Sequence, residues 1–169
     1  MYDFKIDAAD KVSLYGELIE AADALTAGEP DPIANMANLA ALLWESLPEL
    51  NWVGFYRNLG GELVLGPFQG RPACIRIPFG KGVCGAAAAS LAPQLVADVH
   101  AFPGHIACDA ASRAELVVPI LVAGRLVGVL DLDSPVPGRF DKEDEEGCVK
   151  LIQRLAERLG GMAKAPSGA

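Results

Sequence analysis

Two runs of alternating apolar residues, AELVVPILV and LVGVLDLDS, are separated only by the turn sequence AGR, and they constrain the fold more than any other feature. A period of two predicts strands, and a short glycine-containing connection predicts an antiparallel hairpin. The stretch NWVGFYRNLGGELVLGPF predicts a second hairpin with its turn at 58–61. Shorter strands are predicted within RPACIRIPFG and APQLVADVH. The sequence therefore predicts a mainly antiparallel sheet.

Helical spacing of apolar residues marks the remaining segments. It runs through DKVSLYGELIEAADAL and through the segment that begins at Asp31 and Pro32, which are an N-cap and a first helical residue. GKGVCGAAAASL predicts a helix opened by glycines, and Asp141 with Asp144 forms a variant capping box before the last helix. AFPGHIACDAAS predicts a loop. Together these elements predict an α+β fold, with helices covering the sheet.

The overall composition limits the classes of function. The chain has 169 residues, of which 51% are hydrophobic and 21% charged, so a single compact domain is expected. A net charge of −8 disfavours binding to nucleic acid or to anionic lipid. The opening MYDFKIDAAD lacks the apolar core of a signal peptide, and ELVVPILVAGRLVGVLDL is too interrupted to span a membrane. A cytoplasmic location is therefore expected, where thiols are normally reduced.

The four cysteines differ in their surroundings. Cys148 falls on the apolar stripe of the last helix, which predicts a buried, inert thiol. Cys74, Cys84 and Cys108 lie near glycines, prolines or loop residues instead. Cys84 is close to a helix start, where the helix dipole favours a thiolate, and Cys74 alternates with Arg76 on a predicted strand, which predicts exposure to solvent.

A redox role for these cysteines has two rivals, a metal site and simple packing. Cys74, Cys84, His105 and Cys108 could supply four zinc ligands, but the C-x2-C pairing typical of structural zinc is absent. No metal site is therefore expected. The residue types alone leave open that the three cysteines are simply small hydrophobic residues.

Carboxylates gather at one end of the stronger hairpin. Asp131 and Asp133 are two residues apart and leave the same face of a strand, and pairing across the turn brings Glu115 opposite them. Clustered carboxylates raise one another's pKa, so this group could donate a proton or bind a cationic amino group. Trp52 and Tyr56 share another strand face, on which Gly54 between them could leave a gap for a ligand.

At this point the chain resembles a known family. The motifs NWVGFY, PACIRIPFGKGVCG, HIACDAASRAELVVPI and GVLDLDSP are similar to those of free methionine-(R)-sulfoxide reductases, which are stand-alone GAF-fold enzymes. The resemblance implies a central antiparallel sheet of about six strands between helical layers. We expect one GAF-like domain over 1–169, with its core at about 14–159 and a frayed tail at 161–169.

The resemblance also implies roles for individual residues. Cys108 matches the catalytic cysteine, Cys74 the resolving cysteine and Cys84 an additional redox cysteine. The substrate-binding acids and aromatic residues of the family match Glu115, Asp131, Asp133, Trp52 and Tyr56. The implied oxidoreductase reduces free methionine-(R)-sulfoxide through a cysteine sulfenic acid and a redox-active disulfide.

The partners follow from that chemistry. No bound cofactor is expected, and the electrons would come from thioredoxin and ultimately from NADPH. Such an activity belongs to the repair of oxidative damage, and a homodimer is compatible with the resemblance. The alternative is a GAF-type sensor without catalysis, which would bind a small ligand or use Cys74 and Cys108 as a redox switch.

Overall fold

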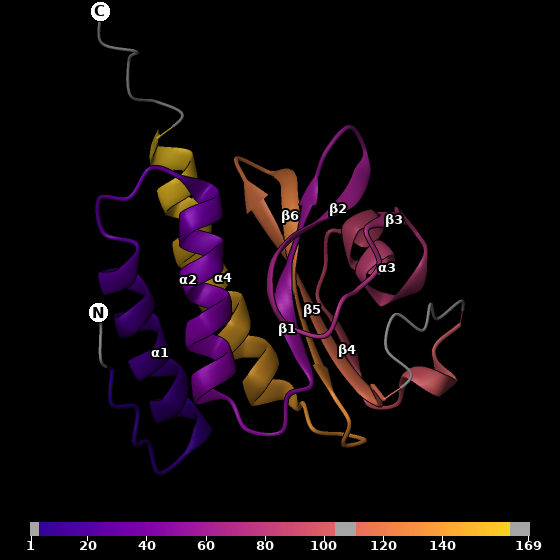
Figure 1. Ribbon diagram of the computed structural model, residues 1–169, viewed down its shortest axis with the longest axis horizontal. Helices are drawn as coiled ribbons and strands as arrows, with labels where there is room; N and C mark the ends of the chain where they lie inside the picture. Colours follow the sequence, from indigo (N-terminus) through magenta and orange to yellow (C-terminus); the bar gives the residue numbers. More distant parts are fainter. Residues whose placement is uncertain (1–3, 104–110, 163–169) are drawn as a thin grey trace, which may run out of the picture.

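The computed structural model describes residues 4–103 and 111–162, which form an α+β fold around one six-stranded antiparallel sheet with strand order β3-β2-β1-β6-β5-β4 (Figure 1). The helices are α1 (Lys11–Leu25), α2 (Pro32–Ser46), α3 (Gly82–Ser90) and α4 (Lys142–Met162), with a short 3-10 turn at Val99–Ala101. The strands are β1 (Trp52–Asn58), β2 (Glu62–Gly70), β3 (Arg76–Pro78), β4 (Gln94–Val96), β5 (Ala114–Val122) and β6 (Arg125–Ser134). The predicted fold class and six-stranded sheet are confirmed.

Helices cover both faces of the sheet, but unequally. Figure 1 shows α1, α2 and α4 on one side of the sheet and α3 alone on the other. Each side has its own apolar cluster: Val53 and Phe55 of β1 pack toward the three-helix layer, whereas Trp52 and Tyr56 pack toward α3. Because successive residues of a strand point to opposite faces, the central strands are buried on both sides.

Both predicted hairpins form. β1 pairs with β2, and β5 pairs with β6, each antiparallel. The second turn is shorter than its AGR sequence suggests, because Arg125 already pairs with Val122. Ala123 and Gly124 occupy the turn with φ of 50° and 75°, as in a type I′ hairpin turn, whose twist matches that of the strands.

The predicted helix starts are also present. The Asp31 side chain accepts hydrogen bonds from the backbone N–H groups of Ile33 and Ala34, and Pro32 is the first residue of α2. At the start of α4 the capping is reciprocal: Asp141 Oδ1 accepts from the Asp144 backbone at 3.1 Å, and Asp144 Oδ2 accepts from the Asp141 backbone at 3.0 Å.

The prediction that Cys74 alternates with Arg76 on a strand is wrong. β3 begins at Arg76, and the last hydrogen bond to β2 before it joins Leu65 N to Ile75 O. Cys74 lies in the connection that precedes this strand, half-buried against the apolar cluster beneath α3. Proline at residue 72 cannot donate a ladder hydrogen bond, which favours this irregular path.

Two predicted features fall on segments that the structure does not describe. Cys108 and His105 belong to 104–110, and the frayed tail belongs to 163–169, so both lie outside the described residues. Within the described ranges, no helix is both long and apolar enough to cross a lipid bilayer.

Candidate active site

A small cavity opens between α3 and the central strands. Its walls come from β1, β5, β6, the start of α3 and the connection after β2. Among its lining residues are Trp52, Tyr56, Arg71, Cys84, Ser112, Glu115, Asp131 and Asp133. The structure thus brings all five predicted substrate-binding residues and Cys84 to one place.

Strand register explains why the carboxylates meet. Glu115 of β5 pairs directly with Asp133 of β6, and Asp133 in turn pairs with Trp52 of β1. Asp131 lies two residues along β6, opposite Gly54. The alternation of side chains puts all of them on the face covered by α3, as the hairpin sequence predicts.

Two of these carboxylates are buried, and no described residue supplies a counter-charge to them. Glu115 is 7% exposed and Asp131 is 6% exposed. Burial raises the pKa of Asp131 to about 7, and burial followed by repulsion from Asp131 and Asp133 raises the pKa of Glu115 well above its ordinary value. Among the described residues no ion pair involves either group, and Asp131 Oδ1 has no hydrogen-bond partner. Burial therefore favours protonation of this pair, and Asp131 presents an acceptor oxygen that no described residue uses.

Cys84 lies against this pair. It is in the first turn of α3, and its Sγ donates a weak hydrogen bond to Glu115 Oε1 at 3.9 Å. Burial, followed by repulsion from Asp131 and Glu115, raises the pKa of the Cys84 thiol well above its usual value. The expectation of a thiolate stabilised by the helix start is therefore wrong, because desolvation and two adjacent acids outweigh the helix dipole.

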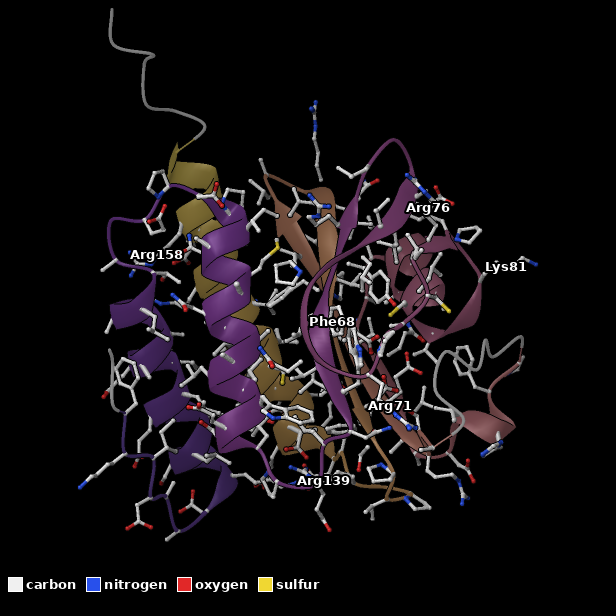
Figure 2. The ribbon with its side chains drawn as sticks, in the orientation of Figure 1. Phe68, Arg71, Arg76, Lys81, Arg139 and Arg158 are labelled. Carbon is white, nitrogen blue, oxygen red and sulfur yellow. The ribbon has the colours of Figure 1, made fainter. Side chains whose placement is uncertain are left out.

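The aromatic side chains that line the cavity, here called the aromatic wall, also differ from their sequence-based interpretation. Trp52 stacks on Tyr56 with ring centroids 5.8 Å apart, and on Phe68 at 5.3 Å. Gly54 leaves no gap for a ligand, since a Cβ added there would meet Phe68 at 2.3 Å and Trp52 at 2.7 Å. The glycine instead lets Phe68, labelled in Figure 2, and Trp52 close over the strand. One stacked wall results, with the Trp52 indole N–H held by Arg71 O at 3.1 Å.

The cysteines fall into two states. Cys74 is disulfide-bonded, whereas Cys84 and Cys148 are free thiols. The Tyr56 hydroxyl donates to Cys74 O at 3.0 Å and so connects that segment to the aromatic wall. Cys148 is fully buried in the helix-side core, as predicted. Cys74 is therefore not merely a small hydrophobic residue.

Arg71 and Ser112 are among the lining residues that the predicted site omitted. Arg71 follows β2, and Figure 2 shows it on the side of the sheet that faces α3. Ser112 is 4% exposed, and its hydroxyl oxygen accepts from Asn51 Nδ2 at 3.0 Å. Neither residue lies in a recognisable sequence motif, because a lone arginine or serine after a loop is common in any sequence. Only the folded connection from β2 to β3 shows that Arg71 reaches the cavity.

Comparison with known proteins agrees with this arrangement. The profile of the GAF domain matches residues 18–161. The free methionine-R-sulfoxide reductase of Escherichia coli K12 is 51% identical over 150 residues, covering 89% of this chain and 91% of that protein. The enzyme of the same name from Saccharomyces cerevisiae is 41% identical over 154 residues, covering 86% of each.

A solved structure is similarly close. The X-ray structure of free methionine-R-sulfoxide reductase from Neisseria meningitidis in complex with its substrate superposes with a TM-score of 0.92 at 44% identity, covering 97% of this chain and 99% of that one. Identity, coverage and fold agree over almost the whole chain. The protein therefore belongs to the GAF domain family and, within it, to the free methionine-R-sulfoxide reductases.

Proposed function

We propose that this protein reduces free L-methionine-(R)-S-oxide to L-methionine. The observation that carries the proposal is the buried carboxyl pair of Glu115 and Asp131, which opens into a cavity next to Trp52 and keeps one acceptor oxygen unused. The names of the E. coli and yeast relatives support the same reaction.

The acidic cavity explains a preference for the free amino acid. A free amino acid carries an α-ammonium group that a peptide-bound methionine lacks, and a buried carboxylate binds such a group strongly. Asp131 would accept one of its protons, with Glu115 and Asp133 beside it. Arg71 at the same cavity provides a cation for the α-carboxylate. The flat indole of Trp52 would lie against the S-methyl end.

The chemistry begins at Cys108. Its thiolate attacks the electrophilic sulfur of the sulfoxide and forms an S–S bond, while the sulfoxide oxygen is protonated to a hydroxyl group. A protonated Glu115, whose pKa is raised by burial, supplies one proton. The hydroxyl group then moves to the cysteine sulfur as the S–S bond and the methionine S–O bond break. This leaves a cysteine sulfenic acid and releases methionine, which is now reduced by two electrons.

A second thiol then regenerates the enzyme. The thiol of Cys74 condenses with the sulfenic acid, which forms a disulfide and releases water. The disulfide at Cys74 and the free state of Cys84 support Cys74 as the resolving cysteine, the role that the family resemblance implies for it. Cys84 is a poor resolving thiol here, because its pKa is raised and only the thiolate is nucleophilic.

The remaining partners complete the proposal. Thioredoxin, a dithiol, would reduce the disulfide and so link the reaction to NADPH. That donor implies a cytoplasmic enzyme that repairs oxidative damage to free methionine. A homodimer stays a prediction, which light scattering coupled to size-exclusion chromatography tests directly.

A coupled assay tests the function. Thioredoxin, thioredoxin reductase and NADPH are supplied with each epimer of free methionine sulfoxide, and with a methionine-sulfoxide peptide. We expect NADPH oxidation with the free R epimer alone. Oxidation of NADPH with the peptide at a comparable rate would overturn the assignment, and no oxidation with any substrate would favour the sensor alternative.

Substitution of the nucleophile gives a second test. Cys108→Ser should abolish turnover, whereas Cys148→Ser, a matched change in the helix-side core, should retain it. Cys74→Ser should complete about one turnover per protein and then stop, since the sulfenic acid lacks its partner. Sustained turnover of Cys74→Ser would reassign the resolving role to Cys84.

A further inference from the structure

We propose that Cys84, Glu115 and Asp131 form a binding site for one thiophilic divalent cation, with Zn²⁺ as the expected ion, and that the ion reversibly blocks the amino-group end of the cavity. One ligand atom from each residue lies within 4.8 Å of the other two, and all three residues are buried. This set differs from the cysteine and histidine set that the sequence analysis rejected, because its carboxylates come from β5 and β6. The blocking role, unlike the binding itself, depends on the proposed function.

The geometry is close to that of a bound ion. In a tetrahedral site with Zn–S and Zn–O bonds of about 2.3 Å and 2.0–2.2 Å, neighbouring ligand atoms lie roughly 3.5 Å apart. Cys84 Sγ and Glu115 Oε1 are already 3.9 Å apart. Small side-chain rotations therefore bring the three atoms into range. The cavity reaches all three residues, which leaves a route of entry and an open fourth position for water.

An independent feature points to a missing cationic ligand. Asp131 is 6% exposed, yet its Oδ1 has no hydrogen-bond partner among the described residues. A buried carboxylate oxygen without a donor is costly, and a cation would relieve that cost. Mg²⁺ and Ca²⁺ prefer all-oxygen ligands, whereas the sulfur of Cys84 selects for a softer ion such as Zn²⁺.

The exchange balances in charge. Zn²⁺ displaces the proton of the Cys84 thiol and any proton held by Glu115 and Asp131, and no electron is transferred. Three anionic ligands then surround a doubly charged ion. The α-ammonium group of a substrate would need the same carboxylate oxygens, so one cavity cannot hold both cations at these atoms.

The test uses protein with the Cys74 disulfide intact, in which Cys84 and Cys148 are the free thiols of the described residues. Zn²⁺ is titrated in competition with a chromophoric chelator. We expect one tight equivalent for the wild type and for Cys148→Ala, and at least tenfold weaker binding for Cys84→Ala and Asp131→Asn. No tight equivalent in the wild type, or equal affinity in all four proteins, would overturn the proposal.

A spectroscopic measurement protects the test against a folding artefact. Co²⁺ in place of Zn²⁺ should give a thiolate-to-metal charge-transfer band in the wild type and in Cys148→Ala, but not in Cys84→Ser, which keeps the side-chain volume. Absence of the band in the wild type would contradict sulfur ligation. Metal binding is measured on oxidised protein, which does not turn over, and reductase activity is measured separately. Metal binding without reductase activity would overturn only the proposed function. Reductase activity without metal binding would overturn only this inference.

Discussion

The described part of the chain contains a buried acidic site on each side of the sheet, and the two sites are built in opposite ways. On the helix side, Asp144 is fully buried but receives four donors: Lys11 Nζ at 2.6 Å, Arg139 at 3.3 Å, the Tyr15 hydroxyl at 2.9 Å and the Asp141 backbone at 3.0 Å. On the α3 side, Glu115 and Asp131 have each other and the weak donor Cys84.

The difference shows that the partners around a buried carboxylate, and not its burial, separate a structural from a functional group. Lys11 and Tyr15 belong to α1 and Arg139 precedes α4, so Asp144 ties these two helices together. Its charge is compensated within the fold. The charge of Asp131 is not compensated by any described residue, so it can be satisfied by a ligand. Substitutions in the two sites test this contrast.

The largest effect is expected from matched substitutions of the two buried aspartates. Asp144→Asn should lower the free energy of unfolding by about 3–5 kcal/mol, because it removes the buried carboxylate beside the buried guanidinium of Arg139 and weakens the anchoring of Lys11. Asp131→Asn should leave it unchanged or raise it, because it removes an uncompensated buried charge. Urea denaturation of both variants at neutral pH measures the difference, and equal losses would contradict the comparison.

The α3-side site should also make stability depend on pH. Glu115 and Asp131 have pKa values raised above those of the unfolded chain, so the folded state holds protons that the unfolded state releases. The stability of the wild type should therefore fall as the pH rises from about 4 to about 7, by up to about 1.4 kcal/mol per pH unit for one group. Asp131→Asn should flatten this slope, while a slope that is unchanged would place its origin elsewhere.

The next largest effect is expected on the catalytic efficiency of the Asp131→Asn variant. Asp131→Asn should reduce kcat/KM for the free sulfoxide by roughly 10–100-fold, the cost of losing one charged hydrogen bond. The rate of Cys74 reduction by thioredoxin should not change, because that step involves no substrate ammonium group. Stopped-flow reduction beside steady-state assays separates these quantities. A parallel loss in both would indicate a general change in the site.

The smallest effect is expected from the two free buried thiols. Cys148→Ala should destabilise the protein by about 1 kcal/mol through lost core packing. Cys84→Ala should change stability less, because Cys84 borders a cavity, but it removes a hydrogen bond that lowers the pKa of Glu115. The pH profile of kcat should therefore shift upward for Cys84→Ala only, and an identical profile in both variants would refute this role of the thiol.

The sequence by itself determined much of the architecture. Periods of two and 3.6 predicted the hairpins and the helices, and the capping box at Asp141 appears where its residues predict it. The hairpin pairing also placed Glu115 beside Asp133. These features depend on contacts close in sequence, where residue spacing directly fixes which side chains share a face.

Only the tertiary structure decided the chemical state of the site. Cys84 is a protonated thiol and not a thiolate because α3 packs it onto carboxylates from β5 and β6, more than 30 residues away in the sequence. Asp144 is compensated and Asp131 is not, although both are aspartates in apolar surroundings. Desolvation and the distance to the nearest cation set these properties, and both arise only when distant segments pack together.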